Sequence, residues 1–477
     1  MPEVITHLPD SDSQMNLLQL LFSSFLMGLI TTSGVLANVA EDSSLPNIIL
    51  IMAEDIGNDL GCYGTDGVKT PTLDSLSKGG IRYTRFYTNS PICSPSRTAI
   101  MLGMYPTSCN GHNHRSSVTA KAGIHYLTHF LRRAGYVNLL GSKVLERKSR
   151  KTDINVRLEE PMFDKSRSEP SKPFFQQIQL QVTHRQANDS RWQDLRAAKA
   201  DPVKTNEILI PPYLPDTPEV RLDWATYLDQ IEQADKETNQ IIKDLARRGQ
   251  LENSIIIWMG DNGRCQIRGK GYLYEDGIRC PLLIWGKGIE KGKVIDDLVS
   301  GVDLTATILA LAGIQLPDQM QGQAFLSNPN YHAKDYVYAA RDRWDEISDC
   351  SRVVIGKRFK YIRNFMPTVP FDAGQKYLDT DNVRPLLPIL RRMHEAGKLN
   401  DSQSYFFRAE KEPEQLYDLD SDPWELDNLA NSSEHQVIKE RLKVRLFDWI
   451  RSINDHGLEQ LSDGTWRPIL DQQKSQL

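Results

Sequence analysis

The fold is decided by residues 47–55, which read NIILIMAED. The first part of this stretch, residues 48–52, is an unbroken apolar run, which is typical of a strand buried on both faces of a sheet. A second apolar run, residues 255–259, is followed by Asp261 and Asn262. In open α/β sheets, ligands bind at the carboxyl ends of the strands. The sequence therefore predicts an α/β fold in which two acidic segments share one site.

Helical and strand-like patterns divide the chain into two parts. Residues 223–248 carry apolar side chains at three- and four-residue spacing, which predicts a long helix packed on the sheet, and residues 304–312 predict a second, buried helix. After residue 335, short strand-like pieces lead to a charged helix over residues 435–453. We therefore predict a larger domain over residues 38–335, which carries the site, and a smaller C-terminal α+β domain over residues 336–477.

A nucleophile beside the start of a helix is predicted by the pentapeptide CSPSR, residues 93–97. Pro95 has a fixed φ and no N–H, so it suits the first turn of a helix. Cys93 then lies beside free backbone N–H groups that favour an anion, and Arg97 adds a forked, permanently charged donor. The pattern indicates a site for sulfate or phosphate. A buried or disulfide-bonded Cys93 is the alternative that the pentapeptide alone leaves open.

Length and composition exclude several classes of protein. The 477 residues are enough for one large core and a smaller domain, and the net charge of −5, with mixed signs, does not indicate a nucleic-acid partner. The six cysteines show neither a CxxC pair nor zinc-like spacing. They are too few for a disulfide scaffold, although one or two bridges remain open.

The N-terminal residues are typical of a secretory leader. Residues 17–30 are mainly apolar, and Val35-Leu36-Ala37 fits a small-residue cleavage site. The apolar run is too short and too interrupted for a stable membrane span, and no other segment is apolar enough for one. We predict a leader and signal peptide over residues 1–37 and a secreted or periplasmic protein, lysosomal if the source is eukaryotic. An apolar N-terminal helix of the mature protein is the alternative.

The pentapeptide resembles the segment in which type I sulfatases, members of the alkaline phosphatase-like superfamily, have a cysteine oxidised to formylglycine. Further segments resemble the same family: NIILIMAED (47–55), LGCYG (60–64), MGDNG (259–263), GKGYLYEDGIR (269–279) and LYDLDSDP (416–423). The resemblance implies an alkaline phosphatase-like fold, with a large mixed sheet flanked by helices and a smaller C-terminal domain. It also implies a formylglycine-generating or equivalent maturation enzyme as a partner.

The resemblance implies a metal ion bound by Glu54, Asp55, Asp261, Asn262 and the modified Cys93. Carboxylate and amide oxygens are hard ligands that suit Ca²⁺ or Mg²⁺ and argue against zinc. The family resemblance favours Ca²⁺ over Mg²⁺. The family usually has Asp where this chain has Glu54, so one ligand arm is longer by a methylene.

Further basic side chains are candidates for contact with a sulfate group beside Arg97. The resemblance assigns this role to Lys270 in a Gly-Lys-Gly loop and to His184, which follows a strand-like segment. The family's Gly-Lys-Trp-His segment is missing from the region after residue 136, so Lys143 and Lys151 both remain candidates for the expected amine. We prefer Lys151, because Lys-Thr-Asp at residues 151–153 resembles a form found in some branches of the family.

The predicted reaction is hydrolysis of a sulfate ester on a sulfated polysaccharide or its oligosaccharides. The resemblance implies that a hydroxyl of the hydrated formylglycine attacks sulfur and that His184 or Lys270 protonates the departing alkoxide. His112, His114 and Arg115 follow the nucleophile helix and are candidates for contact with an anionic sugar. A polar loop without this role is the alternative for these three residues.

Three alternative functions remain open from the sequence. A phosphohydrolase of the same superfamily commonly uses Thr or Ser as its nucleophile, with metal sites richer in His. An N-sulfoglucosamine sulfohydrolase (sulfamidase) would share the motif, which does not separate ester from sulfamate. A non-catalytic binder of sulfated glycans would account for Glu54 and for the irregular region over residues 140–172.

Overall fold

The computed structural model describes residues 45–164, 172–188 and 190–470. The predicted signal peptide, residues 1–37, lies outside these ranges. These described residues belong to one compact unit. Within the described ranges, no helix is both long and apolar enough to cross a membrane.

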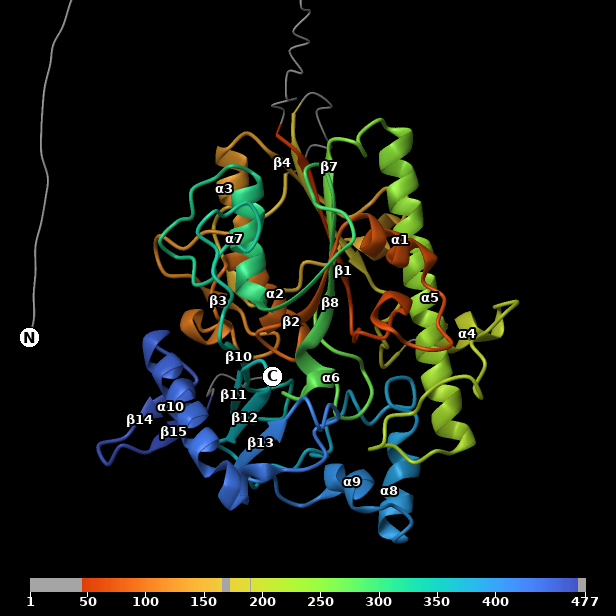
Figure 1. Cartoon of the computed structure of the whole chain (residues 1–477), viewed down its shortest axis with the longest axis vertical. Helices are drawn as coiled ribbons and strands as arrows, with labels where there is room; N and C mark the ends of the chain where they lie inside the picture. Colours follow the sequence, from red (N-terminus) through yellow and green to blue (C-terminus); the bar gives the residue numbers. More distant parts are fainter. Residues whose placement is uncertain (1–44, 165–171, 189, 471–477) are drawn as a thin grey trace, which may run out of the picture. The chain divides into compact units, whose positions relative to one another are not determined.

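A mixed sheet lies at the centre of the described chain (Figure 1). It comprises β4 (Val137–Leu140), β6 (Phe174–Leu180), β1 (Asn47–Ala53), β7 (Ser254–Gly260), β8 (Arg279–Gly286), β2 (Ile81–Tyr87) and β9 (Lys293–Ser300), in this spatial order. The first four strands are parallel, β8 is antiparallel to β7 and β2, and β2 is parallel to β9. This arrangement confirms the predicted large mixed sheet of an α/β protein.

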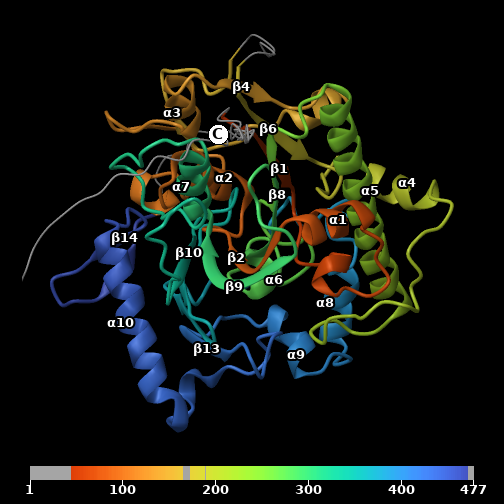
Figure 2. The ribbon, with the colours of Figure 1, turned by 45° about the horizontal axis from the view of Figure 1, so that its top comes forward.

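Helices cover both faces of this sheet (Figure 2). Strand β1 shows the cause, because its apolar side chains alternate between two cores. Ile49 and Ile51 pack in the core that contains α5 (Pro218–Arg247). Ile48 and Leu50 pack in the core that contains α2 (Cys93–Leu102), α3 (Leu127–Arg133) and α7 (Gly301–Leu311). The unbroken apolar run of β1 thus reflects burial on both faces.

The helices that surround the two sheets differ widely in length. They are α1 (Pro71–Gly79), α2 (Cys93–Leu102), α3 (Leu127–Arg133), α4 (Arg191–Ala197), α5 (Pro218–Arg247), α6 (Glu275–Ile278), α7 (Gly301–Leu311), α8 (Leu387–Glu395), α9 (Asp401–Ser404) and α10 (Gln436–Ser452). The long helix α5 begins at Pro218, not at the predicted residue 223. The Thr217 side chain accepts a hydrogen bond from the backbone N–H of Val220, which caps the helix, and Pro218 fits its first turn.

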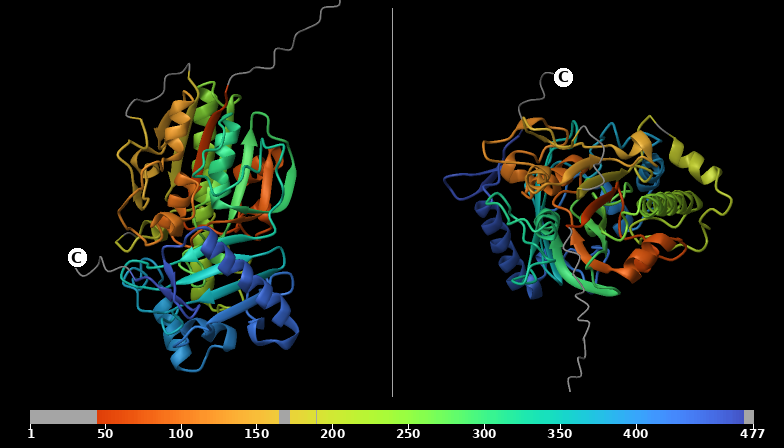
Figure 3. Two further views of the ribbon diagram at one scale, coloured as in Figure 1. Left: turned by 90° about the vertical axis from the view of Figure 1, so that its left-hand side faces the viewer. Right: turned by 90° about the horizontal axis from the view of Figure 1, so that it is seen from above.

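A second sheet lies beyond the carboxyl ends of the parallel strands (Figures 1 and 3). Its antiparallel strands are β10 (Val337–Arg341), β11 (Ser351–Ile355), β12 (Phe359–Asn364) and β13 (Glu414–Asp418), in this order. Helix α10 packs on it through Leu442 and Leu446. The smaller C-terminal part of the predicted fold is therefore confirmed, and its first strand begins at Val337.

Two pairs of short strands complete the described structure. They are β3 (Val118–Thr119) with β5 (Val156–Arg157), and β14 (Leu458–Gln460) with β15 (Trp466–Pro468). The first pair joins the chain that follows α2 to the chain between β4 and β6.

The register of the parallel strands brings three chain segments together at one edge. Ala53 at the end of β1 lies opposite Leu180 of β6 and Gly260 of β7. The hydrogen-bond ladder continues one residue further, because Glu54 N–H donates to Leu180 O and Asp261 N–H donates to Ala53 O, both at 3.0 Å. The side chains that follow these three strands therefore converge.

Candidate active site

The turn after β1 places two acidic side chains in the protein interior. Glu54 and Asp55 are both fully buried. Asp55 has a left-handed backbone conformation, with φ of 50°, which is uncommon for a residue other than glycine. Its N–H donates to Oδ1 of Asp261 at 3.1 Å. This contact stabilises the unusual turn and joins the acidic segments that follow β1 and β7.

Glu54 is surrounded by basic side chains. Lys151 Nζ donates to its Oε2 at 2.6 Å, Arg97 Nη2 lies 3.4 Å from the same oxygen, and His184 Nε2 lies 3.6 Å from it. Burial alone would raise the pKa of Glu54, but the positive charges of Lys151 and Arg97 lower it to about 2. Glu54 is therefore ionised at neutral pH.

Asp55 contacts a different basic side chain, that of Lys270. Lys270 Nζ donates to both of its carboxylate oxygens, at 2.7 and 2.9 Å, and Asn262 Nδ2 donates to Oδ1 at 3.0 Å. Burial alone would raise the pKa of Asp55, but Lys270 lowers it below its usual range. The predicted ligand residues that follow β1 and β7 thus lie in direct contact.

Arg97 links the nucleophile helix to the acidic segment after β7. Its Nε and Nη2 donate to Oδ2 of Asp261 at 2.9 and 2.7 Å. The neighbouring Ser96 hydroxyl donates to the backbone oxygen of Asp261 at 2.5 Å. Burial, together with the nearby carboxylates of Glu54 and Asp55, raises the pKa of Asp261 to about 6 against the effect of Arg97. Three buried carboxylates therefore lie in one cluster, each in contact with a cationic side chain.

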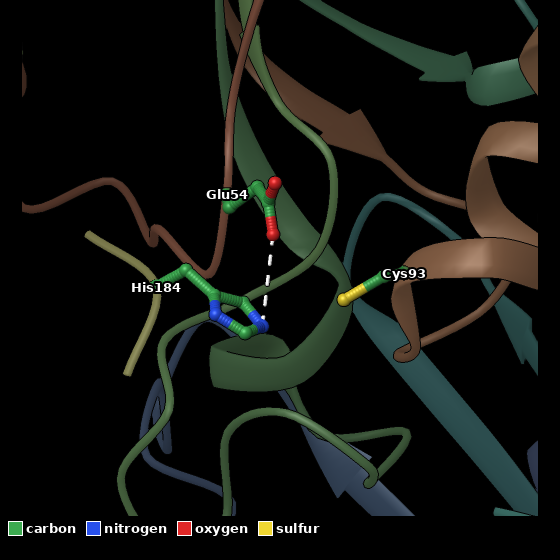
Figure 4. A group of neighbouring side chains, drawn as sticks. All are labelled: Glu54, Cys93 and His184. Carbon is green, nitrogen blue, oxygen red and sulfur yellow. Dashed lines mark ion pairs between the residues drawn. The ribbon is translucent and has the colours of Figure 1, made fainter. Parts of the chain in front are cut away.

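Cys93 is the first residue of α2, so the predicted position beside a helix start is observed. Figure 4 shows its sulfur pointing from the helix start toward the space beside Glu54 and His184. Sγ lies 3.7 Å from Oδ1 of Asp55. Burial raises the pKa of the Cys93 thiol to about 12, so the unmodified thiol is neutral and a weak nucleophile at pH 7. All six cysteines lie in the described ranges, and none of them forms a disulfide.

His184 reaches the cluster from the chain after β6. Its Nε2 lies 3.9 Å from Oδ2 of Asp55, while its Nδ1 has no hydrogen-bond partner among the described residues. Burial and the charge of Lys270 lower the pKa of His184 to about 4. The imidazole is therefore neutral at pH 7 before a ligand binds.

The structure distinguishes the two candidate lysines. Lys151 contacts Glu54 and lines a pocket above Cys93, whereas Lys143 is exposed and is not among the described residues that line this pocket. Asp153, two residues after Lys151, lies 3.7 Å from Nη1 of Arg97. The geometry therefore favours Lys151 over Lys143 as the amine near the nucleophile.

The pocket above Cys93 includes two of the three proposed sugar contacts. His114 and Arg115 line it, and both approach Oδ1 of Asp345, at 3.0 and 3.6 Å. His112 is buried and does not belong to the described lining of this pocket; it lies near Asp455 instead. The structure thus separates His112 from the other two residues.

Three lining residues were missed by the sequence analysis. Trp344, Asp345 and Tyr377 enter the pocket from the chain after β10 and from the region before α8. Tyr377 lies over Lys270, whose Nζ is 5.7 Å from the ring centre. No local motif marks these residues, because they reach the pocket only through the packing of the second sheet against the first.

The donor set fits a hard divalent cation. Oε1 of Glu54 and Oδ1 of Asn262 are buried, and in the described part of the chain neither has a hydrogen-bond partner. Both lie in the cluster that contains the carboxylates of Asp55 and Asp261. Oxygen ligands of this kind suit Ca²⁺ or Mg²⁺. The residues present therefore agree with the predicted metal site.

Fold and site together define an enzyme of the alkaline phosphatase-like fold that hydrolyses esters of an oxyanion. The family model described as Sulfatase matches residues 46–314, and a second model, described as N-sulphoglucosamine sulphohydrolase, C-terminal, matches residues 263–369. The protein belongs to the sulfatase family and is a sulfuric ester hydrolase.

Curated relatives are similar to this chain in sequence, and solved structures are similar to it in fold. An ulvan-active sulfatase of Formosa agariphila is 31% identical over 464 residues, which cover 86% of this chain and 75% of the relative. Human N-sulphoglucosamine sulphohydrolase is 24% identical, with 84% and 89% covered. A structure described as a complex with its substrate D-glucosamine-2-N,6-O-disulfate has a TM-score of 0.61 at 16% identity, with 86% of this chain and 99% of that chain covered.

Proposed function

We propose that this sulfatase hydrolyses sulfate esters on a sulfated polysaccharide or its oligosaccharides, through a formylglycine made from Cys93 and with Ca²⁺ bound. The ulvan-active relatives support the substrate class. We also propose that the protein is secreted or periplasmic and that a formylglycine-generating or equivalent enzyme matures it. Both follow from the predicted signal peptide and from the CSPSR segment.

The position and chemistry of Cys93 carry the proposal. It stands at the start of α2 against Asp55, where its thiol is neutral. A neutral buried thiol cannot act as the thiolate that nucleophilic cysteine chemistry requires. Formylglycine at this position would supply, as its hydrate, a hydroxyl that attacks sulfur while the bond from sulfur to the sugar oxygen breaks. The second hydroxyl of the hydrate would then lose its proton and expel sulfate, which restores the aldehyde.

Four side chains would hold the metal: Glu54, Asp55, Asp261 and Asn262. Their oxygens are buried, and two of them lack a hydrogen-bond partner in the described residues. Ca²⁺ would supply positive charge that polarises a sulfate oxygen and the attacking hydroxyl. The second role proposed for Asp261 is to accept the proton of that hydroxyl, because its segment lies beside the first turn of α2.

Arg97 and Lys151 would bind the sulfate oxygens. Asp261 fixes the guanidinium of Arg97 through Nε and Nη2, while Nη1 has no hydrogen-bond partner among the described atoms. Lys151 lines the pocket above Cys93 and carries a second positive charge. Donors held in place before the reaction stabilise the negative charge that develops on the sulfate oxygens.

His184 or Lys270 would protonate the departing alkoxide. Both line the pocket above Cys93 and lie near Asp55. His184 is neutral without ligand, but a sulfate beside Nε2 favours the protonated imidazole. His184 would thus become an acid when the substrate binds. His114 and Arg115 lie at the same pocket and would contact the sugar.

A second candidate function is cleavage of a sulfamate, as in N-sulfoglucosamine sulfohydrolases. The match of residues 263–369 to the C-terminal model of that group favours it, as does the human relative. The leaving atom would then be nitrogen in place of oxygen, with the same residues around sulfur. The two functions are distinguished by whether the protein releases sulfate from O-sulfated or from N-sulfated sugars.

The test is made on protein from a host that produces formylglycine. We expect the mass of the peptide that contains residue 93 to show an aldehyde in place of the thiol. We also expect the protein to release sulfate from at least one of a panel of ulvan, carrageenan, heparin and chondroitin sulfate fragments. A retained thiol in such a host would contradict the proposed chemistry. Release of sulfate only from N-sulfated glucosamine would favour the sulfamidase.

A further inference from the structure

A large cavity lies beside the pocket above Cys93. Its volume is about 670 Å³, which is typical of cavities that bind organic ligands. Its walls come from the chain after β4, from the end of β6 and the chain that follows it, and from α4 and α5. Five glutamines line it, so we call it the glutamine cavity: Gln179, Gln181, Gln186, Gln233 and Gln240.

His184 joins the glutamine cavity to the active site, because it belongs to the walls of both. Its Nε2 lies 3.6 Å from Glu54 in the active site. A group in the cavity is thus separated from the proposed sulfate position by one side chain. The ladder of β4 with β6 ends where Leu140 lies opposite Gln177. Residues 178–180 of β6 extend past β4, and the cavity lies at this extension.

The amides of the wall match the hydroxyl groups of a sugar. An amide side chain both donates and accepts hydrogen bonds, as a hydroxyl group does. Gln179 is fully buried, and neither its Nε2 nor its Oε1 has a partner among the described residues. A buried amide without partners is unfavourable. Gln179 therefore indicates that a bound ligand completes this wall.

An indole ring adds an apolar surface to the cavity. Trp192 of α4 lines it, and its N–H donates to the backbone oxygen of Asn382 at 2.7 Å. The guanidinium of Arg185 lies 3.9 Å from the ring centre. These contacts hold the ring in one orientation. A fixed aromatic ring among polar groups is typical of small-molecule sites, and it suits the apolar face of a sugar.

The charges of the wall indicate which sugars fit. One arginine, Arg191, and two glutamates, Glu146 and Glu237, line the cavity. A sulfate or a uronate there would meet more negative than positive formal charge. The cavity therefore suits uncharged sugar units, in contrast to the active site with its cluster of cationic side chains.

We propose that the glutamine cavity binds the uncharged sugar units next to the sulfated unit of the substrate chain. This inference rests on the proposed sulfatase function and extends it. The enzyme then acts better on fragments that fill both the active site and the cavity than on a single sulfated sugar. Hydrogen bonds from the glutamines supply the additional affinity.

The test uses formylglycine-bearing enzyme and fragments of two, four and six sugar units prepared from its best polysaccharide substrate. p-Nitrophenyl sulfate serves as a substrate without sugar units. We expect kcat/KM to rise about tenfold or more with fragment length, since each tenfold corresponds to one or two hydrogen bonds. We expect this rise to persist at about 0.5 M NaCl, because contacts with uncharged sugars are not screened by salt.

Two variants assign the rise to the cavity. Gln179→Leu keeps the approximate volume and removes the amide, and the double variant Gln233→Ala/Gln240→Ala changes two positions of α5 to a good helix former. We expect each to lower the ratio of kcat/KM for the longest fragment to that for p-nitrophenyl sulfate by about tenfold. Asn239→Ala is the matched control on α5, since Asn239 is not among the described residues of the wall.

The possible outcomes separate the two proposals. Hydrolysis with no dependence on fragment length, or a rise that both variants retain, contradicts the glutamine cavity and leaves the sulfatase function intact. A rise that disappears in salt contradicts the uncharged character of the neighbouring units. Absence of sulfate release from every fragment, with formylglycine present, overturns both proposals.

Discussion

Two buried charge clusters in this protein differ in how completely their donors are paired. In the active site, Nε and Nη2 of Arg97 donate to Asp261, but Nη1 has no hydrogen-bond partner among the described residues. In the second sheet, Nε and Nη2 of Arg352 donate to Asp455, and Nη1 donates to Asp342 and to the backbone oxygen of Ser351. Both guanidiniums are fully buried.

This difference indicates which cluster serves the fold and which serves a ligand. A buried charge is stable in a protein only when it is paired and hydrogen-bonded. Arg352 meets this condition within the protein, so its cluster, which we call the closed cluster, stabilises the second sheet. The cluster around Arg97, which we call the open cluster, keeps donors and acceptors without hydrogen-bond partners. They include Oε1 of Glu54 and Oδ1 of Asn262 in the described structure. A metal ion and a sulfate would complete it.

The largest effect is expected for Cys93→Ala. This variant removes the residue that the open cluster surrounds, and we expect sulfate release to fall on the order of 10⁴-fold or more, as for loss of other nucleophiles. The measurement is kcat on the best substrate, with the melting temperature recorded for the same preparation. Cys62→Ala is the control, since Cys62 lies outside the site. Retained activity in Cys93→Ala would contradict the assignment of the open cluster to the reaction, because this cluster would then not hold the nucleophile.

The matched pair Arg97→Met and Arg352→Met tests the comparison directly. Removal of Arg352 leaves the buried carboxylates of Asp342 and Asp455 without the cation that pairs with both, which costs about 3–5 kcal/mol of folding free energy. We expect kcat per folded molecule to stay unchanged in this variant. Arg97→Met should lower kcat by about 10²–10³-fold, as does loss of a donor to a developing negative charge. Urea unfolding and kcat are measured on both variants with Ca²⁺ present.

Two results of this pair would contradict the interpretation. The first is a large loss of kcat in folded Arg352→Met, which would give the second-sheet cluster a role in the reaction. The second is a loss of stability in Arg97→Met, with Ca²⁺ present, equal to that in Arg352→Met. The open cluster would then be structural to the same degree as the closed one.

Addition of Ca²⁺ should stabilise the protein through the open cluster. A ligand that binds only the folded state at 100 times its Kd adds about 2.7 kcal/mol of folding free energy. We expect the melting temperature to rise with Ca²⁺, to fall after treatment with EGTA, and to respond less to Mg²⁺. Glu54→Gln should lose most of the response, whereas Arg352→Met should keep it. A melting temperature that is insensitive to Ca²⁺ in the unmodified and the formylglycine-bearing protein would contradict the metal site.

Features with a local sequence signal were predicted well. The apolar run before Glu54 predicted β1, because burial on both faces removes the alternation of a half-exposed strand. The pentapeptide predicted a helix start beside Cys93, since Pro95 fits only the first turn, and α2 indeed begins at Cys93. The acidic residues after β1 and β7 were expected to meet, and the parallel register brings them together.

Features that depend on packing between distant segments were not predicted. Trp344 and Tyr377 reach the pocket from the C-terminal part, and no spacing in the sequence relates them to Cys93. The sequence also grouped His112 with His114, although the chain between them directs the two side chains to different surroundings. The start of α5 was placed late, because the capping Thr217 stands among prolines that favour extended backbone.

The smallest effect is expected from acid acting on the closed cluster. Burial alone would raise the pKa of Asp455, but the charge and hydrogen bonds of Arg352 outweigh it and lower the pKa below its usual value. A lowered folded-state pKa contributes stability that is complete above the unfolded-state pKa and is lost as pH falls through the folded-state pKa. Asp455→Asn removes this contribution. The difference in unfolding free energy between the two proteins should therefore be largest near pH 7.

Urea unfolding at a series of pH values between 7 and 3 measures this difference. We expect it to shrink as the pH falls below the ordinary range of an aspartate, because Asp455 then takes up a proton on unfolding and loses its advantage over asparagine. Asp420→Asn on the chain after β13 is the control, since it lies outside the cluster. A difference that grows toward pH 3 would mean that Asp455 is destabilised by burial more than it is stabilised by Arg352. The second-sheet cluster would then be incompletely compensated, and the contrast with the active site would weaken.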